Sequence, residues 1–439
     1  MQNYDKQFKG KKITVIGLGI LGRGLGYTKF LAECGADLIV TDLKTKKQLA
    51  TSVKALKKFS GIKFILGEHR LRDFKNRDMV IKSAGVPLDS IYIKEAQKNK
   101  IPIEMDVSLF VKCAPGVKII GITGTRGKSM VTALVYEILK KNEKFLKKKI
   151  YIGGNVRGVA TLPLLKKVKV GDILVCELDS WQLQGFGDSK ISSHISVFTS
   201  FMPDHMNYYK NSMKKYFEDK ANIFKYQKKN DILIIRPDVK KLIPKNLKSQ
   251  LMVVKSGNFQ EENRACAIEV AKQCKIPDSK ITQALKNFKG LEGRLQYVKT
   301  VKEVKIYNDN NATTPEATIA GIEVLSINFR TPGVREKKIV LICGGADKKL
   351  PLDNFVKTVN KYCRNVIMIP GTGTDRLSSR KLKVESYKVK DLKIAVKTAL
   401  GLALRGDIIL FSPAFASFGQ FNNEYERNDL FMEIVKKLK

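Results

Sequence analysis

Short apolar runs alternate with longer amphipathic stretches along the whole 439-residue chain. The apolar runs are rich in Ile and Val, which is typical of strands that are buried on both faces of a parallel sheet. The stretches between them have the spacing of helices. This alternation predicts an α/β protein in which helices cover parallel sheets.

The predicted strands fall into three groups along the chain. They are ITVIG, DLIVTD, IKFIL and DMVIKSAG; then GVKIIGIT, DILVCEL, ISVFTSF and DILIIRP; then KIYND, KIVLICGG, NVIMIPG and DIILFSP. Each group has its own helices, and 439 residues exceed what one hydrophobic core usually supports. We therefore expect three domains at 1–114, 115–296 and 297–439. The first and last are expected to be Rossmann-like.

The first domain opens with a glycine-rich loop in the stretch KKITVIGLGILGRGLGYTKFLAECGADLIVTD. A strand ends in Gly17-x-Gly19-x-x-Gly22, a helical stretch follows, and a second strand ends in Asp42, 42 − 22 = 20 positions later. In a dinucleotide-binding fingerprint such glycines let a pyrophosphate approach the backbone, and the acid binds a ribose. A dehydrogenase is therefore one hypothesis.

A second glycine-rich loop, GITGTRGKSM at 121–130, follows a predicted strand and precedes a helical stretch. Its glycines leave backbone N–H groups open to phosphate oxygens at a helix N-terminus. Lys128 can then reach the β- and γ-phosphates, and the Ser129 hydroxyl can bind Mg²⁺. Ile122 replaces the first glycine of the strict pattern, so this is a variant P-loop. A structural turn is the alternative, but Gly-Lys-Ser before a helix favours a P-loop ATPase-like central domain.

Composition and charge narrow the partners. The net charge of +39 comes from lysines spread along the whole chain, without an arginine-rich arm or an aromatic-interleaved basic strip. We therefore expect anionic substrates and no nucleic acid. No apolar stretch resembles a membrane span or a signal peptide, and the seven scattered cysteines have no C-x-x-C pair. These features predict a cytoplasmic protein with reduced thiols and no membrane insertion, and we expect a monomer.

Seven motifs in a fixed order resemble those of the ATP-dependent Mur ligases. They are GTRGKS (124–129), GGNVRG (153–158), ELDSWQL (177–183), PDHMNYY (203–209), NDNNATTPEAT (308–318), GGADK (344–348) and SPAFASFGQF (412–421). The last two motifs and the Rossmann-like first domain resemble the members of this family that add D-glutamate. The resemblance implies ATP and Mg²⁺ as cofactors, and UDP-N-acetylmuramoyl-L-alanine and D-glutamate as substrates. It also implies that the first glycine loop binds a UDP-sugar rather than NAD, which glycine spacing alone cannot distinguish.

The same resemblance assigns roles to single residues. For ATP they are Gly124, Thr125, Arg126, Gly127, Lys128, Ser129, Asn263, Arg294 and Asp309. For the UDP-sugar they are Gly17, Leu18, Gly19, Gly22, Asp42, Ser83, Gly85, Asn155 and Gln182. For the amino acid they are Thr313, Lys348, Ser417 and Phe418. The implied metal ligands are Ser129, Glu177, His205 and Lys220, and the implied catalytic residues are Lys128, His205 and Lys220. Ordinary ion-pair, capping or loop roles are the alternatives for the residues after position 290.

Two of the implied metal ligands also follow from strand positions. Glu177 ends a predicted strand and His205 follows another, so both are expected at the sheet edge that carries the P-loop. A solvated carboxylate and a packing histidine are the alternatives. Lys220 lies 220 − 205 = 15 residues after His205, where the resemblance implies a carbamylated lysine. Carbamylation would turn a cation into an anion that can bridge to a second Mg²⁺; a solvated lysine is the alternative.

The chain departs from the family pattern at several positions. These are Asp179, Ser200, the Phe259–Gln260 pair, Asn311 and Gly419. They lie beside the expected sites, so they bear on substrate geometry more than on ATP use. Two further hypotheses remain: a related ligase for another amino acid, including a folate-type polyglutamate ligase, and a degenerate paralogue that binds nucleotide or precursor and regulates. The intact Gly-Lys-Ser, together with Glu177, His205 and Lys220, speaks against degeneration.

Overall fold

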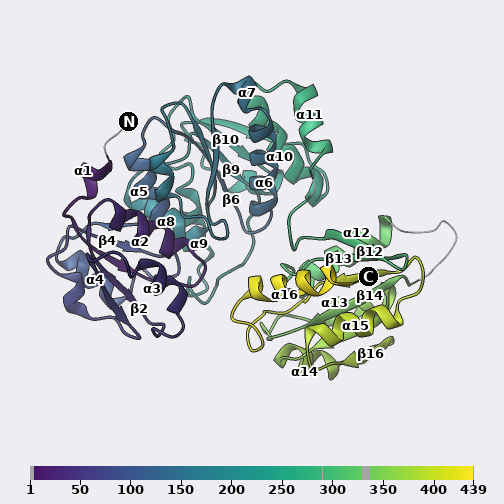
Figure 1. Cartoon of the computed structure of the whole chain (residues 1–439). Helices are drawn as coiled ribbons and strands as arrows, with labels where there is room; N and C mark the ends of the chain where they lie inside the picture. The colour runs from purple at the N-terminus through teal and green to yellow at the C-terminus, as the bar shows by residue number, and fades with distance from the viewer. Residues whose placement is uncertain (1–3, 289, 329–336, 439) are drawn as a thin grey trace. The chain divides into compact units, whose positions relative to one another are not determined.

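The computed structural model describes residues 4–288, 290–328 and 337–438, and the chain divides into two compact units, 1–288 and 289–439. The first unit holds two parallel sheets, and the second holds a third sheet that is parallel except at one edge (Figure 1). The predicted α/β class is therefore confirmed.

The N-terminal sheet of the first unit has the parallel order β3-β2-β1-β4-β5. Its strands are β1 (Lys12–Ile16), β2 (Asp37–Asp42), β3 (Ile62–Leu66), β4 (Met79–Lys82) and β5 (Ile103–Glu104). Its helices are α1 (Tyr4–Phe8), α2 (Arg23–Glu33), α3 (Ala50–Leu56), α4 (Ile91–Lys98) and α5 (Asp106–Cys113), with a 3₁₀ helix at Leu71–Phe74. Because β1 lies between β2 and β4, the strand order reverses at β1, and such a reversal is where doubly wound sheets bind ligands, at the carboxyl ends of the strands.

The central sheet has the parallel order β11-β10-β9-β6-β8-β7. Its strands are β6 (Lys118–Thr123), β7 (Ile150–Gly154), β8 (Ile173–Glu177), β9 (Ile195–Phe198), β10 (Ile232–Ile235) and β11 (Gln250–Val253). Its helices are α6 (Lys128–Lys141), α7 (Glu143–Leu146), α8 (Ser180–Asp188), α9 (Met213–Ala221), α10 (Phe259–Gln273) and α11 (Asp278–Lys286), with 3₁₀ helices at Leu162–Lys166 and Pro237–Leu242. Ile120 and Ile122 of β6 pack under Val135 of α6 and Val270 of α10 in one buried cluster.

A buried carboxylate ties these two sheets into one unit. Asp106, at the start of α5, accepts hydrogen bonds from the N–H groups of Thr161 and Leu162, both at 2.7 Å. Leu162 begins the 3₁₀ helix Leu162–Lys166, which follows β7 along the chain, and Thr161 precedes this helix directly. One buried apolar cluster contains residues of both sheets, such as Val15 of β1 and Leu174 of β8, because no solvent layer separates the two sheets.

The second unit has the sheet order β12-β13-β17-β14-β15-β16. Its strands are β12 (Gln296–Val301), β13 (Val304–Asn308), β14 (Ile339–Gly344), β15 (Cys363–Ile369), β16 (Glu385–Lys388) and β17 (Ile408–Phe411). Its helices are α12 (Pro315–Asn328), α13 (Asp353–Tyr362), α14 (Thr372–Ser378), α15 (Leu392–Leu402) and α16 (Glu424–Lys436). Adjacent residues of β14 belong to different clusters, Val340 to one and Leu341 to the other, so both faces of this sheet are buried.

The strands that the apolar pattern predicted are all present, and those it missed lie at sheet edges. The missed strands are β5, β7, β11, β12 and β16. An edge strand pairs on one side only and is partly exposed; most residues of β11 and β16 are exposed. Such strands lack the continuous apolar run of a central strand, so the pattern carried no signal for them.

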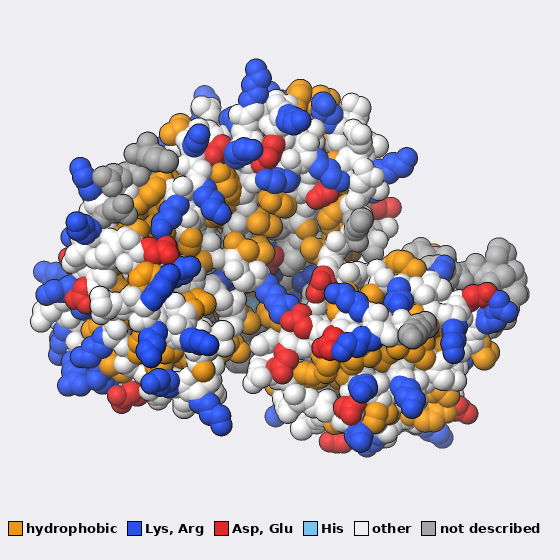
Figure 2. Space-filling model, viewed as in Figure 1, with side chains coloured by type: hydrophobic (Ala, Val, Ile, Leu, Met, Phe, Trp, Pro, Cys, Tyr) orange, Lys and Arg blue, Asp and Glu red, His pale blue; other side chains and the backbone are white. Residues whose placement is uncertain are grey.

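All seven cysteines lie in the described residues as free thiols, and Cys176, Cys343 and Cys363 are buried within strands. On the face that Figure 2 shows, Lys and Arg side chains are scattered over the surface rather than gathered in one patch. Within the described part of the chain, no helix has the length and apolar character needed to cross a bilayer.

Candidate active site

The first glycine loop is held at the carboxyl end of β1 by backbone and carboxylate contacts. The Gly17 N–H donates to Thr41 O at 2.8 Å, and the Gly19 N–H donates to Asp42 Oδ2 at 2.8 Å. Gly17 has φ +91°, and a Cβ on it would lie 2.2 Å from Ser83 Oγ. The structure therefore brings together four of the predicted UDP-sugar residues, Gly17, Gly19, Asp42 and Ser83.

Asp42 braces this loop with both of its carboxylate oxygens. Oδ1 accepts from the Lys44 N–H at 2.8 Å, while Oδ2 accepts from Gly19. Gly22 precedes α2 with φ +86°, and Leu18 is buried beneath the loop. Gly85 follows β4, with open space where a side chain would be. The carboxylate thus shapes the loop, and its role toward a ribose stays a prediction.

The other two predicted UDP-sugar residues lie on the central sheet's loops. Asn155 follows β7 and donates from Nδ2 to Glu177 Oε1 at 3.3 Å. Gln182 lies in the first turn of α8, where its N–H donates to Asp179 Oδ1 at 2.7 Å. Gln182 Oε1 in turn accepts from the Asp179 N–H at 3.3 Å. Asp179, a departure from the family pattern, therefore caps a helix, as a serine there would also do.

The second glycine loop joins β6 to α6 at the carboxyl edge of the central sheet. Gly127 caps α6 with φ +90°, and a Cβ on it would lie 2.5 Å from Asn263 Oδ1, so only glycine fits against α10. Lys128 Nζ donates to Gly124 O at 3.0 Å and to Thr125 O at 3.2 Å. The predicted ATP residues of the first unit, including the buried Asn263, are thus brought together.

The segment after β9 braces the P-loop through hydroxyl groups. The Thr125 N–H donates to Ser200 O at 2.7 Å, and the Arg126 N–H donates to Ser200 Oγ at 2.9 Å. Thr199 Oγ1 and Ser200 Oγ both donate to Arg126 O. Sequence reasoning missed Thr199 and treated Ser200 only as a departure. A hydroxyl residue pair directly after a strand next to the P-loop strand was the available signal.

The predicted metal ligands lie around this edge because β6 is flanked by β8 and β9. Glu177 ends β8 and is buried, and His205 follows β9 with φ +56°. The His205 ring lies 4.6 Å from the Trp181 ring, and burial lowers the pKa of this imidazole, which favours the neutral form that can bind a metal. Among the described residues, no group of three or more His, Cys, Asp or Glu side chains is close enough to hold a metal ion.

Lys220 of α9 is a buried lysine rather than a solvated one, so the solvated alternative is wrong. Only 1% of it is exposed, and its Nζ donates to Gly124 O at 2.9 Å. It also lies 4.9 Å over the Tyr216 ring. Burial, and then the charge of Lys128, lower the pKa of Lys220 well below its ordinary value. Both effects favour the neutral amine.

An ion pair joins the P-loop to the segment of His205. Arg126 Nη1 donates to Asp204 Oδ2 at 3.0 Å, with 43% of the arginine and 29% of the aspartate side chain exposed. Burial raises the pKa of Asp204, but His205 and Arg126 outweigh burial and the net shift is downward. An ion pair this exposed contributes about 0–1 kcal/mol to stability. It is therefore weak enough to be exchanged for a ligand.

The Phe259 departure also finds a partner in the structure. The Arg236 guanidinium, at the end of β10, lies 4.6 Å over the Phe259 ring and forms an ion pair with Glu262. Asn263 follows one helical turn after Phe259, so both lie on the same side of α10. Phe259 therefore packs against Arg236, while Asn263 lies against Gly127 of the P-loop.

In the second unit, three loops meet because β13, β17 and β14 are parallel neighbours. Lys348 Nζ, after β14, donates to Thr313 Oγ1, after β13, at 3.0 Å. Ala346 pairs with Ala416, which places Ser417 on the adjoining loop. Ser417 is buried and Phe418 is 63% exposed. The structure therefore brings Thr313 and Lys348 into contact and holds the loop of Ser417 and Phe418 beside the Lys348 loop.

The predicted nucleotide residues of the second unit, Arg294 and Asp309, lie near the carboxyl end of β13. Asp309 accepts from Ser412 Oγ at 2.8 Å and from the Leu295 N–H at 3.0 Å. Burial raises its pKa to about 7. Arg294 precedes Leu295 directly, and its N–H donates to Leu291 O at 3.2 Å. Asn311, a departure, ties this loop to position 293 by donating from its own N–H to Gly293 O at 2.9 Å.

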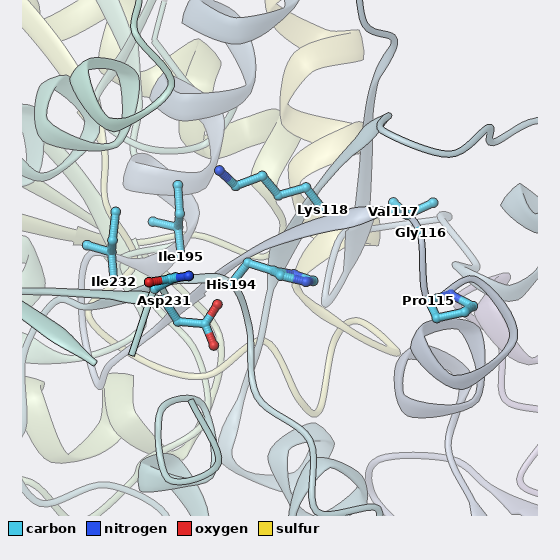
Figure 3. A pocket seen from close by; sticks show the side chains of 9 residues that line it. Pro115, Gly116, Val117, Lys118, His194, Ile195, Asp231 and Ile232 are labelled. Carbon is cyan, nitrogen blue, oxygen red and sulfur yellow. The ribbon is translucent and has the colours of Figure 1, made fainter. Parts of the chain in front are cut away.

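A cavity of about 340 Å³ lies away from this chemistry (Figure 3). Its lining includes Lys118, Ile195 and Ile232, the first residues of β6, β9 and β10, so it lies at the opposite end of the sheet from the P-loop. His194 borders it, and its Nδ1 accepts from the Ile119 N–H at 3.0 Å. The other lining residues lie in the segments that precede these strands, and none of the lining residues is a predicted site residue.

The fold and the loop at 124–129 define a P-loop protein with a carboxylate at the end of one flanking strand, β8, and an imidazole in the segment after the other, β9. Three family models match the chain: the MurD-like N-terminal domain of the Mur ligases at 11–104, the Mur ligase middle domain at 122–293, and the Mur ligase glutamate ligase domain at 293–415. The chain belongs to the Mur ligase family. This membership sets the dehydrogenase hypothesis aside.

Individual proteins agree with the family assignment. A UDP-N-acetylmuramoylalanine–D-glutamate ligase of Borreliella burgdorferi is 33% identical over 98% of this chain and 99% of that protein. An enzyme of the same name from Roseiflexus is 32% identical over 98% and 99%. Among solved structures, UDP-N-acetylmuramate-alanine ligase MurC of Thermotoga maritima has the same fold, with a TM-score of 0.62 and 18% identity over 97% of this chain and 99% of that one.

Proposed function

We propose that this Mur ligase adds D-glutamate to UDP-N-acetylmuramoyl-L-alanine, with ATP activating the carboxylate as an acyl phosphate. The identity of a third over almost the full length of D-glutamate ligases supports this choice of substrates within the family. The reaction belongs to peptidoglycan precursor synthesis. The single structural observation that carries the chemistry is the sheet edge where the P-loop, Glu177, His205 and Lys220 lie on adjoining elements.

The residues of this edge suit phosphoryl transfer. Lys128 lies over the loop with its ammonium on the Gly124 and Thr125 carbonyls, where it can neutralise charge on a transferred phosphoryl group. Thr199 and Ser200 fix the loop, so its dipoles need no rearrangement during reaction. Such positioning and charge neutralisation supply most of the catalysis in this class of reaction.

The residues fit Mg²⁺ on one condition. Ser129 and Glu177 supply the oxygen ligands that Mg²⁺ prefers, and His205 supplies a neutral nitrogen. Lys220 as an ammonium would repel the ion, whereas a carbamate on it would attract it. The lowered pKa of Lys220 supports carbamylation, because CO₂ adds only to the neutral amine. Bound Mg²⁺ would supply charge neutralisation for the phosphates.

We propose amino-acid binding for the second unit. Lys348 and Thr313 supply a cation and a hydroxyl in contact, which suits a dicarboxylic amino acid. Ser417 and Phe418 lie on the loop paired to that of Lys348. Arg294 and Asp309 are proposed to contact nucleotide phosphate and ribose. The domain boundaries proposed are 1–114, 115–296 and 297–439, which the three separate sheets and the ranges of the family models support.

The first experiment measures phosphate release with UDP-N-acetylmuramoyl-L-alanine, ATP and Mg²⁺ against a panel of D- and L-amino acids. We expect release with D-glutamate and little with the others. Release with another amino acid in place of D-glutamate would identify a related ligase instead. A protein that binds ATP but releases no phosphate with any amine would be the regulatory paralogue.

A further inference from the structure

The P-loop carries a second cation besides Lys128. Arg126 occupies the variable position of the loop, between Thr125 and Gly127, and its side chain is 43% exposed at the same sheet edge. Among the described residues, its guanidinium forms a hydrogen bond to one side chain, from Nη1 to Asp204 at 3.0 Å. A guanidinium has five N–H donors in a planar fork that matches phosphate oxygens, so most of this fork is open for a ligand.

Two backbone N–H groups of the loop already have hydrogen-bond partners, whereas such groups in a P-loop ordinarily face phosphate. The Thr125 N–H is bonded to Ser200 O and the Arg126 N–H to Ser200 Oγ, at 2.7 and 2.9 Å. Both N–H groups therefore point at the β9 segment and not at a ligand. The same hydrogen bonds fix the backbone of Arg126, so its side chain starts from a defined place beside the loop.

We propose that Arg126 is a catalytic residue that leaves Asp204 and binds the γ-phosphate of ATP, replacing the missing backbone donors. This inference rests on the proposed use of ATP. In the step concerned, the bond between the γ-phosphorus and the β–γ bridging oxygen breaks and a bond to the substrate carboxylate oxygen forms. ADP leaves with the electron pair. Arg126 stabilises charge on the transferring group, and Asp204 receives the arginine again when phosphate departs.

Nucleotide affinity separates this role from a structural one. Isothermal titration calorimetry with Mg²⁺ would compare ADP with the non-hydrolysable analogue AMP-PNP in wild type and Arg126→Gln. A γ-phosphate contact predicts that the variant weakens AMP-PNP binding about 10–100-fold and leaves ADP within about twofold. Phosphate release should fall about 10³-fold with unchanged circular dichroism. Arg126→Lys should be intermediate, because it keeps the charge but not the fork.

Two further variants complete the test. Asp204→Asn removes the partner but leaves the arginine, so its effect on AMP-PNP should be much smaller than that of Arg126→Gln. Arg380→Gln breaks another exposed arginine–aspartate pair, to Asp353, and should change neither nucleotide affinity. Equal loss for ADP and AMP-PNP, no loss for either, or equal effects of Arg126→Gln and Asp204→Asn would overturn the inference. A wild-type protein that binds neither nucleotide would instead refute the proposed function.

Discussion

The two glycine loops of the first unit lie at the same kind of position in the chain, and charged side chains of opposite sign bond to their backbones. Each follows a parallel strand and precedes a helix, and each ends in a glycine with a similar positive φ, +86° at Gly22 and +90° at Gly127. The first loop is braced by the carboxylate of Asp42, through Gly19. The second is braced by neutral hydroxyls of Thr199 and Ser200.

The charged groups beside the loops extend this contrast. Lys128 and Lys220 both donate to Gly124 O in the second loop, and Arg126 adds a third cation. At the first loop the charged side chain that bonds to the loop backbone is the carboxylate of Asp42. Both loops use a glycine to turn from a strand into a helix, whereas the side chains around each loop determine its chemistry. A loop with cations suits phosphoryl transfer, and a loop held by a carboxylate suits binding without transfer.

The largest expected effect is at the second loop. Lys128→Ala should lower the rate of phosphate release about 10³-fold or more, because it removes a positive charge from the transferring phosphoryl group. Circular dichroism should be unchanged, since no core residue is altered. Lys118→Ala, at the other end of β6, is the matched control and should stay within about twofold. Near wild-type turnover in Lys128→Ala would mean that the second loop has only a structural role and does not differ from the first loop in catalysis.

A smaller effect is expected at Lys220 of α9, which donates to the second loop. The experiment tests whether this cation becomes an anionic carbamate. Lys220→Arg should lose about 10²-fold in turnover although it keeps a positive charge, because arginine cannot form a carbamate. Acetate at millimolar concentration should partly restore Lys220→Ala and should not affect wild type. Mass spectrometry under ¹³CO₂ with chemical trapping would detect the adduct. A fully active Lys220→Arg enzyme would rule the carbamate out.

The smallest effect is expected at the first loop. Asp42→Ala removes the acceptor for the Gly19 and Lys44 N–H groups, so the loop loses its brace. We expect the KM for UDP-N-acetylmuramoyl-L-alanine to rise about tenfold, while the KM for ATP stays within about twofold. Steady-state kinetics with each substrate varied in turn would measure both. If only the KM for ATP rose, ATP would bind at the first loop, and the roles that the comparison gives to the two loops would be exchanged.

Local sequence was sufficient for the central strands, both glycine loops and the motif order. The runs around Ile13, Ile120 and Ile339 are apolar because those strands are buried on both faces, so their burial can be predicted from the sequence alone. The Gly-Lys-Ser before α6 predicted the P-loop for a similar reason: a tight turn, a reaching lysine and a helix start are all local requirements. Edge strands such as β16 were missed because partial exposure leaves no such pattern.

Contacts between distant segments were decided by the tertiary structure alone. That Lys220 is buried against Gly124, 220 − 124 = 96 residues earlier, depends on how α9 packs beside the β6 loop, and nothing in the neighbouring residues distinguishes it from the chain's many surface lysines. The same holds for Ser200 on the P-loop and for Arg126 with Asp204. The order of residues specifies which chemical groups exist and which local turns they favour, whereas the dielectric environment, and with it the pKa of a buried amine, arises only when segments far apart exclude water together.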